Sequence, residues 1–158
     1  TKFEQLVDEL KRDDFLYVVP DFRLNKQFEK LNSLSEVYKQ KVEFLCNECC
    51  WYGCKDRREC YKTVSKQNLG IDCTDHICKA PYSNEGYRFS RVMESPGFIS
   101  LDDILNIYVP MGYSNFKIEG RDLGNALLLE FILYYMVKPQ YQIHVREAMY
   151  LDAMLDLF

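Results

Sequence analysis

The segments Val42–Cys46 (VEFLC) and Asn115–Glu119 (NFKIE) decide the fold class of this chain of 158 residues. Each is a short run that predicts a β-strand. A third segment, Phe15–Val19 (FLYVV), is apolar without interruption, which is typical of a strand buried on both faces of a parallel sheet. We expect these three strands and a fourth, shorter one near residues 98–99.

Helical patterns separate the strands. Apolar residues recur at helical spacing in Phe3–Leu10 and again in Leu24–Leu34, where Asn25 is the expected N-cap. The segment Ser100–Asp103 predicts a capping box at the start of another helix. Further helices are expected over Arg57–Leu69, Asp122–Val137 and from Gln140 onward.

This alternation of strands and helices predicts βα units with parallel strands. No Gly-rich phosphate loop follows any of the strands, which favours a barrel over a nucleotide-binding doubly wound sheet. A (β/α)₈ barrel needs eight strands, and this chain offers about half of them. We therefore expect a single α/β domain over residues 1–158 that forms half of a TIM-type barrel.

Composition bears on whether the chain binds nucleic acid, whether it contacts a membrane and where in the cell it is found. The net charge is -4, which argues against tight nonspecific binding of nucleic acid, although Lys55, Arg57, Arg58 and Lys62 form a local basic patch. No apolar run reaches the ~20 residues needed to cross a bilayer. No signal peptide begins the chain. We expect a cytoplasmic protein with no membrane contact.

All seven cysteines lie between Cys46 and Cys78, in an expected cysteine-rich loop over about residues 46–78. Their odd number, without an export signal, argues against a disulfide framework. The pairs Cys46-x₂-Cys49 and Cys73-x₄-Cys78 resemble a structural zinc site, but thiolates suit iron–sulfur clusters equally. Free thiols are the third alternative. We expect Cys46 to be a core residue and Cys60, inside a helix, to be structural.

A family resemblance enters at the second half of the chain. The segment Phe98–Ile104 (FISLDDI), then Gly112, then Asn115–Arg121 (NFKIEGR) resembles the signature of the collagenase-like peptidase family, also called peptidase family U-thirty-two. In relatives a helix ending near a tyrosine pair follows, as Tyr134 and Tyr135 do here. Cysteines upstream of the signature are a further family feature.

The resemblance covers about residues 15–141 and implies a distorted (β/α)₈ barrel, of which this chain is the C-terminal half. Several members bind a [4Fe–4S] cluster through four cysteines. Some are named peptidases or collagenases, and others support hydroxylation of RNA bases or of a quinone precursor. The stretch Asn47–Arg57 is similar to that of an uncharacterised branch. The ligand set that the resemblance implies is Cys50, Cys54, Cys73 and Cys78.

Charged residues follow the strands. In a barrel, chemistry collects at the carboxyl ends of the strands, and Glu48, Glu119 and Arg121 fall there. Lys117 and Glu119 are two residues apart, so we expect both on one side of the strand, as a buried ion pair near the site. The functional interpretation makes Glu119 a base or a ligand of metal-bound water and Arg121 an anion clamp. The alternative is structural: a salt bridge pins the strand, and Glu48 fixes the cysteine loop.

Three functions remain open from the sequence. The first is an iron–sulfur enzyme that acts on an anionic or RNA-type substrate. The second is a non-catalytic half-barrel, stabilised by zinc or thiols, that binds a partner chain. The third is a peptidase, which would need a metal-bound water because no Ser-His-Asp arrangement is present. The His-Glu-x-x-His motif of zinc peptidases is absent too. A half-barrel leaves strand edges unpaired, so we expect an N-terminal half-barrel, a partner subunit or a homodimer.

Overall fold

A short parallel sheet organises the computed structural model, which describes residues 2–81, 83–86, 88–120 and 123–155. Strand β1 (Glu43–Leu45) pairs in parallel with β2 (Asn115–Lys117), with Phe44 opposite Phe116. Side chains alternate across the sheet, so these two rings lie on the same face and stack at 6.1 Å between centroids. The expected α/β class with parallel strands is confirmed, while the half-barrel stays a prediction.

The strand expected at Phe15–Val19 is reduced to a single bridging residue. Val18 donates its N–H to the carbonyl of Lys41 (2.8 Å) and accepts the N–H of Glu43 (3.0 Å), which makes one parallel bridge beside β1. Leu16, two residues earlier, is 78% exposed. The expected burial on both faces is therefore wrong within this chain, because no described segment covers the outer side.

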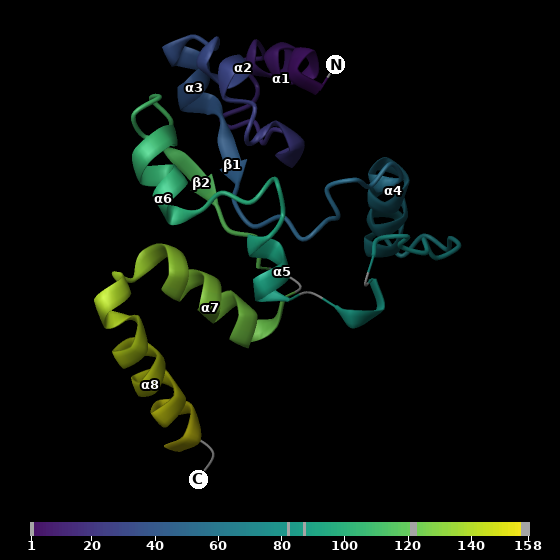
Figure 1. Ribbon diagram of the computed structural model, residues 1–158. Coiled ribbons are helices and arrows are strands. Elements are labelled where there is room, and N and C mark those ends of the chain that lie inside the picture. The colour runs from purple at the N-terminus through teal and green to yellow at the C-terminus, as the bar shows by residue number, and fades with distance from the viewer. Residues whose placement is uncertain (1, 82, 87, 121–122, 156–158) are drawn as a thin grey trace.

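Helices surround the sheet (Figure 1). In chain order they are α1 (Lys2–Leu10), the 3₁₀ turn η1 (Phe22–Leu24), α2 (Phe28–Asn32), α3 (Glu36–Lys41), α4 (Arg57–Asn68), the 3₁₀ turn η2 (Ser83–Glu85), α5 (Phe89–Met93), α6 (Leu101–Asp103), the π-helix η3 (Ile104–Tyr108), α7 (Gly124–Met136) and α8 (Pro139–Leu155). The first three α-helices lie at one end of the sheet, and α4 stands to one side of it. The helices expected near the start, middle and end of the chain are confirmed, with small shifts at their ends.

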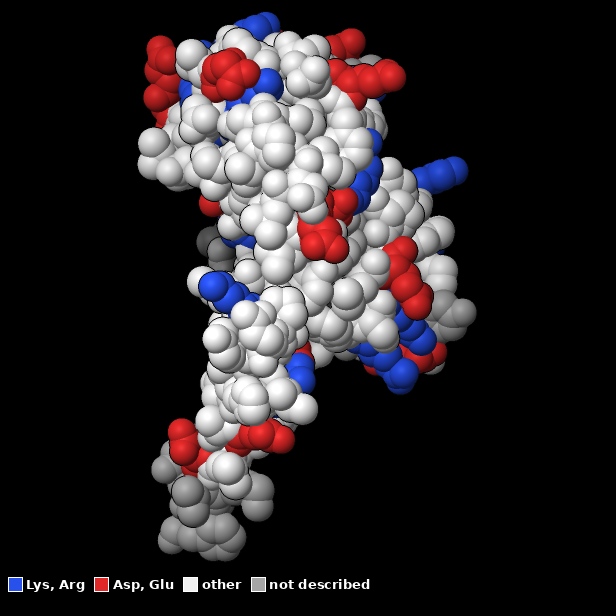
Figure 2. Space-filling model, turned by 60° about the vertical axis from the view of Figure 1, so that its left-hand side comes forward, with Lys and Arg blue, Asp and Glu red and all other residues white. Residues whose placement is uncertain are grey.

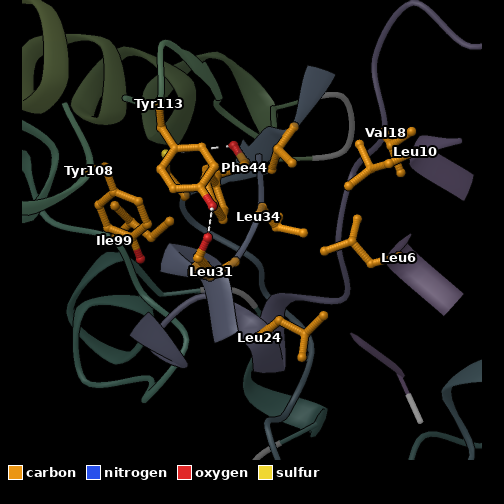
Figure 3. Close-up of a cluster of buried hydrophobic side chains, with 12 residues drawn as sticks. Leu6, Leu10, Val18, Leu24, Leu31, Leu34, Phe44, Ile99, Tyr108 and Tyr113 are labelled. Carbon is orange, nitrogen blue, oxygen red and sulfur yellow. Dashed lines mark hydrogen bonds between the residues drawn. The ribbon is translucent and has the colours of Figure 1, made fainter. Parts of the chain in front are cut away.

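The main core lies between α1, α2, β1 and the loop that precedes β2 (Figure 3). Tyr108 and Tyr113 are fully buried there, and both pack edge-on against Phe44 at 4.9 Å between centroids. Buried tyrosine hydroxyls need a partner, and that of Tyr113 donates to the carbonyl of Leu31 at 2.8 Å. This bond ties the approach to β2 to helix α2.

The segment after Ser100 begins as expected and then changes period. Ser100 and Asp103 form a capping box, in which each side chain accepts the other's backbone N–H. Beyond it the helix widens, because the N–H of Val109 donates to the carbonyl of Ile104, five residues back. It ends at Gly112, whose φ of +93° suits glycine and whose added Cβ would lie 2.6 Å from Glu36 Oε2.

Helices α7 and α8 form a hairpin, and α8 projects from the body (Figures 1 and 2). Arg146 of α8 makes two hydrogen bonds to the carboxylate of Glu130 on α7, at 3.0 and 2.5 Å. A smaller apolar cluster, built on Val92, Phe98 and Phe131, joins α7 to α5. Among the described residues, every helix is too short or too polar to cross a membrane.

Asn25 is a buried tie between distant segments, and its expected role as an N-cap is wrong. Its side chain is fully buried and donates to the carbonyls of Leu45 (3.1 Å) and Gly97 (2.7 Å). Its own carbonyl accepts the hydroxyl of Tyr108. Helix α2 begins only at Phe28, because Asn25 is held inward.

We predict that Asn25→Ala lowers the free energy of unfolding by about 3 kcal/mol, because two carbonyls lose their donor at roughly 1–3 kcal/mol each. Urea denaturation measures the change. The matched control is Asn32→Ala, on an exposed position of α2, which we expect to change stability by less than about 0.5 kcal/mol. Equal effects of the two variants would contradict the role of Asn25.

Candidate functional site

The site is built where β1 and β2 end, and the side chain of Asn47 holds the two ends together. The last backbone bond of the pair joins Cys46 N to the carbonyl of Lys117, at 2.9 Å. One step further on, the buried Asn47 amide donates to the carbonyl of Glu119 (3.0 Å) and accepts the N–H of Glu119 (2.7 Å). An amide side chain thus continues the ladder and brings Glu48 and Glu119 to the same place.

Glu48 is buried and ion-paired. Only 2% of its side chain is exposed, and its Oε2 accepts a hydrogen bond from Arg57 Nη2 at 2.6 Å. Its other oxygen accepts the N–H of Cys50 at 3.0 Å. Each carboxylate oxygen therefore has a donor, as a buried charge requires. The carboxylate also fixes the path of the chain after β1.

Glu119 faces this pair from β2. Its Oε2 accepts the N–H of Cys49 at 3.2 Å, and within the described residues it forms no ion pair of its own. Burial and the negative charge of Glu48 raise the pKa of Glu119 above its ordinary value of 4.5. Two neighbouring carboxylates thus have different environments, which is the arrangement that separates an acid from a base.

Cys49 completes a group of three donor atoms. One ligand atom each from Glu48, Cys49 and Glu119 lies within 4.8 Å of the others. Desolvation of the sulfur and the charges of the two carboxylates raise the pKa of Cys49 well above the usual value of a thiol. The thiol is therefore protonated at neutral pH in the metal-free chain, and it points a weak donor at Glu48 Oε1 from 3.8 Å.

Arg57, at the start of α4, is shared by several groups. Its guanidinium lies over the rings of Phe22 (4.9 Å) and Tyr61 (4.7 Å), and Nη2 also contacts the hydroxyl of Tyr61 at 2.9 Å. Burial, and the charge of Glu48, raise the pKa of Tyr61 to about 12. Arg57 therefore makes cation–π contacts with two aromatic rings while it neutralises Glu48.

The structure brings four cysteines into electrostatic contact. Burial and the charges of Cys78 and Cys54 raise the pKa of Cys60. Burial raises the pKa of Cys50, and the negative charges of Glu48 and Cys54 raise it further. The positive charge of Arg57 acts in the opposite direction and lowers it. Each of Cys50, Cys54, Cys60 and Cys78 thus has another cysteine as an electrostatic neighbour. Among the described residues, no three of these four sulfurs lie within 4.8 Å of one another. Three of the four belong to the set implied by the resemblance.

The remaining cysteines lie elsewhere. Cys73 contacts the carbonyl of Thr63 through its sulfur at 3.8 Å. Cys46 is a core residue, as expected, with 1% exposure and a pKa that burial raises to about 12. Its burial among apolar side chains speaks against the alternative zinc set, in which Cys46 and Cys49 pair with Cys73 and Cys78. Cys60 lies on the first turn of α4, inside a helix as expected.

The expected buried pair of Lys117 and Glu119 is wrong. Lys117 is exposed and lies 3.6 Å from Glu43, on the neighbouring strand. The regular strand ends at Lys117, so the alternation that would have placed Glu119 beside it does not continue. Lys117 is therefore not in the site. Arg121, the expected anion clamp, lies outside the described residues.

No family model, curated protein or solved structure matches this chain.

We predict that Arg57→Met lowers the free energy of unfolding by about 3 kcal/mol, because it leaves the buried Glu48 carboxylate without its cation. The double variant Glu48→Gln/Arg57→Met is expected to be more stable than Arg57→Met alone, because the uncompensated charge is gone. Urea denaturation of the metal-free protein measures both.

The matched control is Arg12→Met, which removes an exposed ion pair with Asp14. We expect it to cost no more than about 1 kcal/mol. A cost of Arg57→Met as small as that of Arg12→Met would show that the Glu48–Arg57 pair is not a buried constraint.

Proposed function

We propose that this chain is part of an iron–sulfur enzyme, with a [4Fe–4S] cluster bound by Cys50, Cys54, Cys60 and Cys78. The observation that carries the proposal is a series of electrostatic neighbours: Cys60 interacts with Cys54 and Cys78, and Cys50 interacts with Cys54 and with the Glu48 carboxylate after β1. Four thiolates are the usual ligand set of such a cluster, which supplies one-electron transfer when bound. The location matches the catalytic face of a barrel.

The chain's own residues supply proton handling and charge balance. Glu119, with its raised pKa, holds or releases a proton next to the substrate position. Glu48 and Arg57 fix the cysteine loop through Cys50 N–H and position the group. Arg57 also offsets part of the negative charge that four thiolates bring. The substrate in this proposal is anionic or of RNA type, and Arg121 remains its proposed clamp.

A second candidate is a metal-dependent peptidase, which rests on the Glu48, Cys49 and Glu119 group. Three protein ligands and an open position are the pattern of catalytic zinc, where the metal activates water. Glu48 is already engaged by Arg57 and by Cys50 N–H. We therefore place this function below the iron–sulfur proposal. A cytoplasmic location fits both, because all seven cysteines are free thiols.

We predict that anaerobically purified protein is brown and carries about four irons and four sulfides per chain. Cys60→Ser should lose most of the iron, because Cys60 interacts with Cys54 and Cys78. Cys73→Ser should keep it, because the Cys73 sulfur contacts the carbonyl of Thr63. Iron, sulfide and zinc analysis with absorbance spectra checks this. Loss of iron in Cys73→Ser but not in Cys60→Ser would restore the ligand set of the resemblance. One zinc without iron would contradict the cluster and make the loop a structural zinc site or the peptidase site.

The proposal also includes the C-terminal half of a TIM-type barrel completed by an N-terminal half-barrel, a partner subunit or a second copy. Support comes from the outer side of the sheet. The segment around Val18 has β1 on one edge and exposes Leu16 (78%) and Tyr17 (47%). Exposed strand edges of this kind invite pairing with another chain. The non-catalytic reading shares this interface and lacks the cluster.

We predict that the isolated chain self-associates at micromolar concentration, because its strand edge and the apolar side chains beside it are uncovered. Leu16→Lys should shift the protein toward monomer in sedimentation velocity. The matched control is Val37→Lys, a substitution at an equally exposed apolar residue on α3 (72%). A chain that stays monomeric at all concentrations would contradict the proposed interface.

A further inference from the structure

A basic groove lies next to the site, on the side of α4. It has a volume of about 740 Å³ and is bounded by α1, the turn at Val19–Arg23 and the start of α4. Five cations line it, against two carboxylates, in a chain whose net charge is -4. The cations are Lys2, Arg23, Lys55, Arg57 and Arg58, and the carboxylates are Glu9 and Asp21. The positive charge is therefore concentrated here against the sign of the whole chain.

The groove continues along the exposed face of α4. A second hollow of about 550 Å³ shares Arg58 and Tyr61 with the first and extends to Lys62, Ser65 and Lys66. Arg58, Lys62 and Lys66 are spaced four residues apart, so they form one row with about 6 Å between successive positions. Lys62 is paired with Glu59 on the same helix.

Three of these cations form no ion pair within the described part of the chain. They are Lys55, Arg58 and Lys66, and all three are exposed. The charge of Arg58 acts on Glu59 without a direct pair. By contrast, Lys2 and Arg23 are both engaged by Asp21, and Arg57 by Glu48. The free cations thus run from the mouth of the groove outward along α4. Such a row suits a ligand with several negative charges spaced along it, and a single small anion would leave most of the row unused.

An aromatic ring lies in the middle of this row. Tyr61 lines both hollows and is 54% exposed, while the Arg57 guanidinium beneath it and the bond to its hydroxyl hold the ring in place. Cations that track a backbone, together with an ordered exposed ring, form the combination that binds unstacked bases. A duplex keeps its bases stacked and offers no free face to such a ring.

We propose that the groove and the outer face of α4 together bind one single strand of nucleic acid, with phosphates on Lys55, Arg58 and Lys66 and one base on Tyr61. The proposal rests on the anionic substrate of the proposed function and names its class. It does not depend on the metal. The strand enters along α4 and reaches the groove beside Cys54, which places it next to the Glu48–Glu119 site.

Fluorescence anisotropy with a labelled 12-nucleotide single-stranded RNA tests the proposal on the full chain. Lys55→Ala/Arg58→Ala/Lys66→Ala should reduce the slope of log affinity against log salt by about 2, because each phosphate contact on a single strand contributes about 0.7. Tyr61→Leu should weaken binding by about tenfold, whereas Tyr61→Phe, which keeps the ring, should retain it. The matched control is Lys30→Ala/Lys138→Ala, which removes exposed charge elsewhere.

Loss of salt slope in the α4 variant, with affinity retained in the control, supports the proposal. Equal weakening by both sets of substitutions would overturn it, since nonspecific charge would then explain the binding. A second outcome would also overturn the proposal: inorganic polyphosphate or duplex RNA binds as tightly as the single strand, and Tyr61→Leu has no effect on binding. Metal content measured on the same samples separates this outcome from failure of the iron–sulfur proposal, because a variant can lose the strand and keep its iron.

Discussion

The side chain of Asn47 is the contact on which the site depends. Parallel strands of three residues each make few backbone bonds, and the pair of β1 and β2 would diverge after Lys117. The Asn47 amide supplies a donor and an acceptor to Glu119 in the geometry of another strand residue. Because Glu48 and Cys49 follow it directly, this one amide sets their separation from the carboxylate on the other strand. The charged groups are thus brought together by neutral hydrogen bonds.

The helices could be predicted from the sequence because their signals are local. Periodic apolar residues marked α1, and the capping box at Ser100 marked a helix start that the structure confirms. Strands depend on what lies beside them, and Phe15–Val19 shows the limit of composition. An apolar run indicates that a segment is suited to burial. Whether it is buried depends on another segment that packs against it, which the run itself does not reveal. Asn25 failed for the same reason: its partners are 20 and 72 residues away.

The site was predicted in part. The rule that chemistry gathers at the carboxyl ends of parallel strands placed Glu48 and Glu119 in the same region, and the structure brings them together. The same rule could not predict that Lys117 lies outside the site. The loop after β2 decides where the strand ends, and the strand ends at Lys117. Nor could spacing show which cysteines are neighbours of Cys60. Cys78 interacts with it because of the path that the loop takes after α4.

The π-helical turn after the capping box makes that part of the chain adjustable in length. A turn with bonds to the fifth residue contains one residue more than an α-helix would hold in the same place, as Val109 and Ile104 show. Deleting a single residue there lets the turn close to the α-helical pattern, so the cap and the glycine end can both survive. Later side chains then keep the sides they face, whereas the same deletion in a regular α-helix would rotate each of them by about 100°. An evolutionary loss of one residue in the widened turn would therefore leave Tyr108 in the core and the backbone path largely intact.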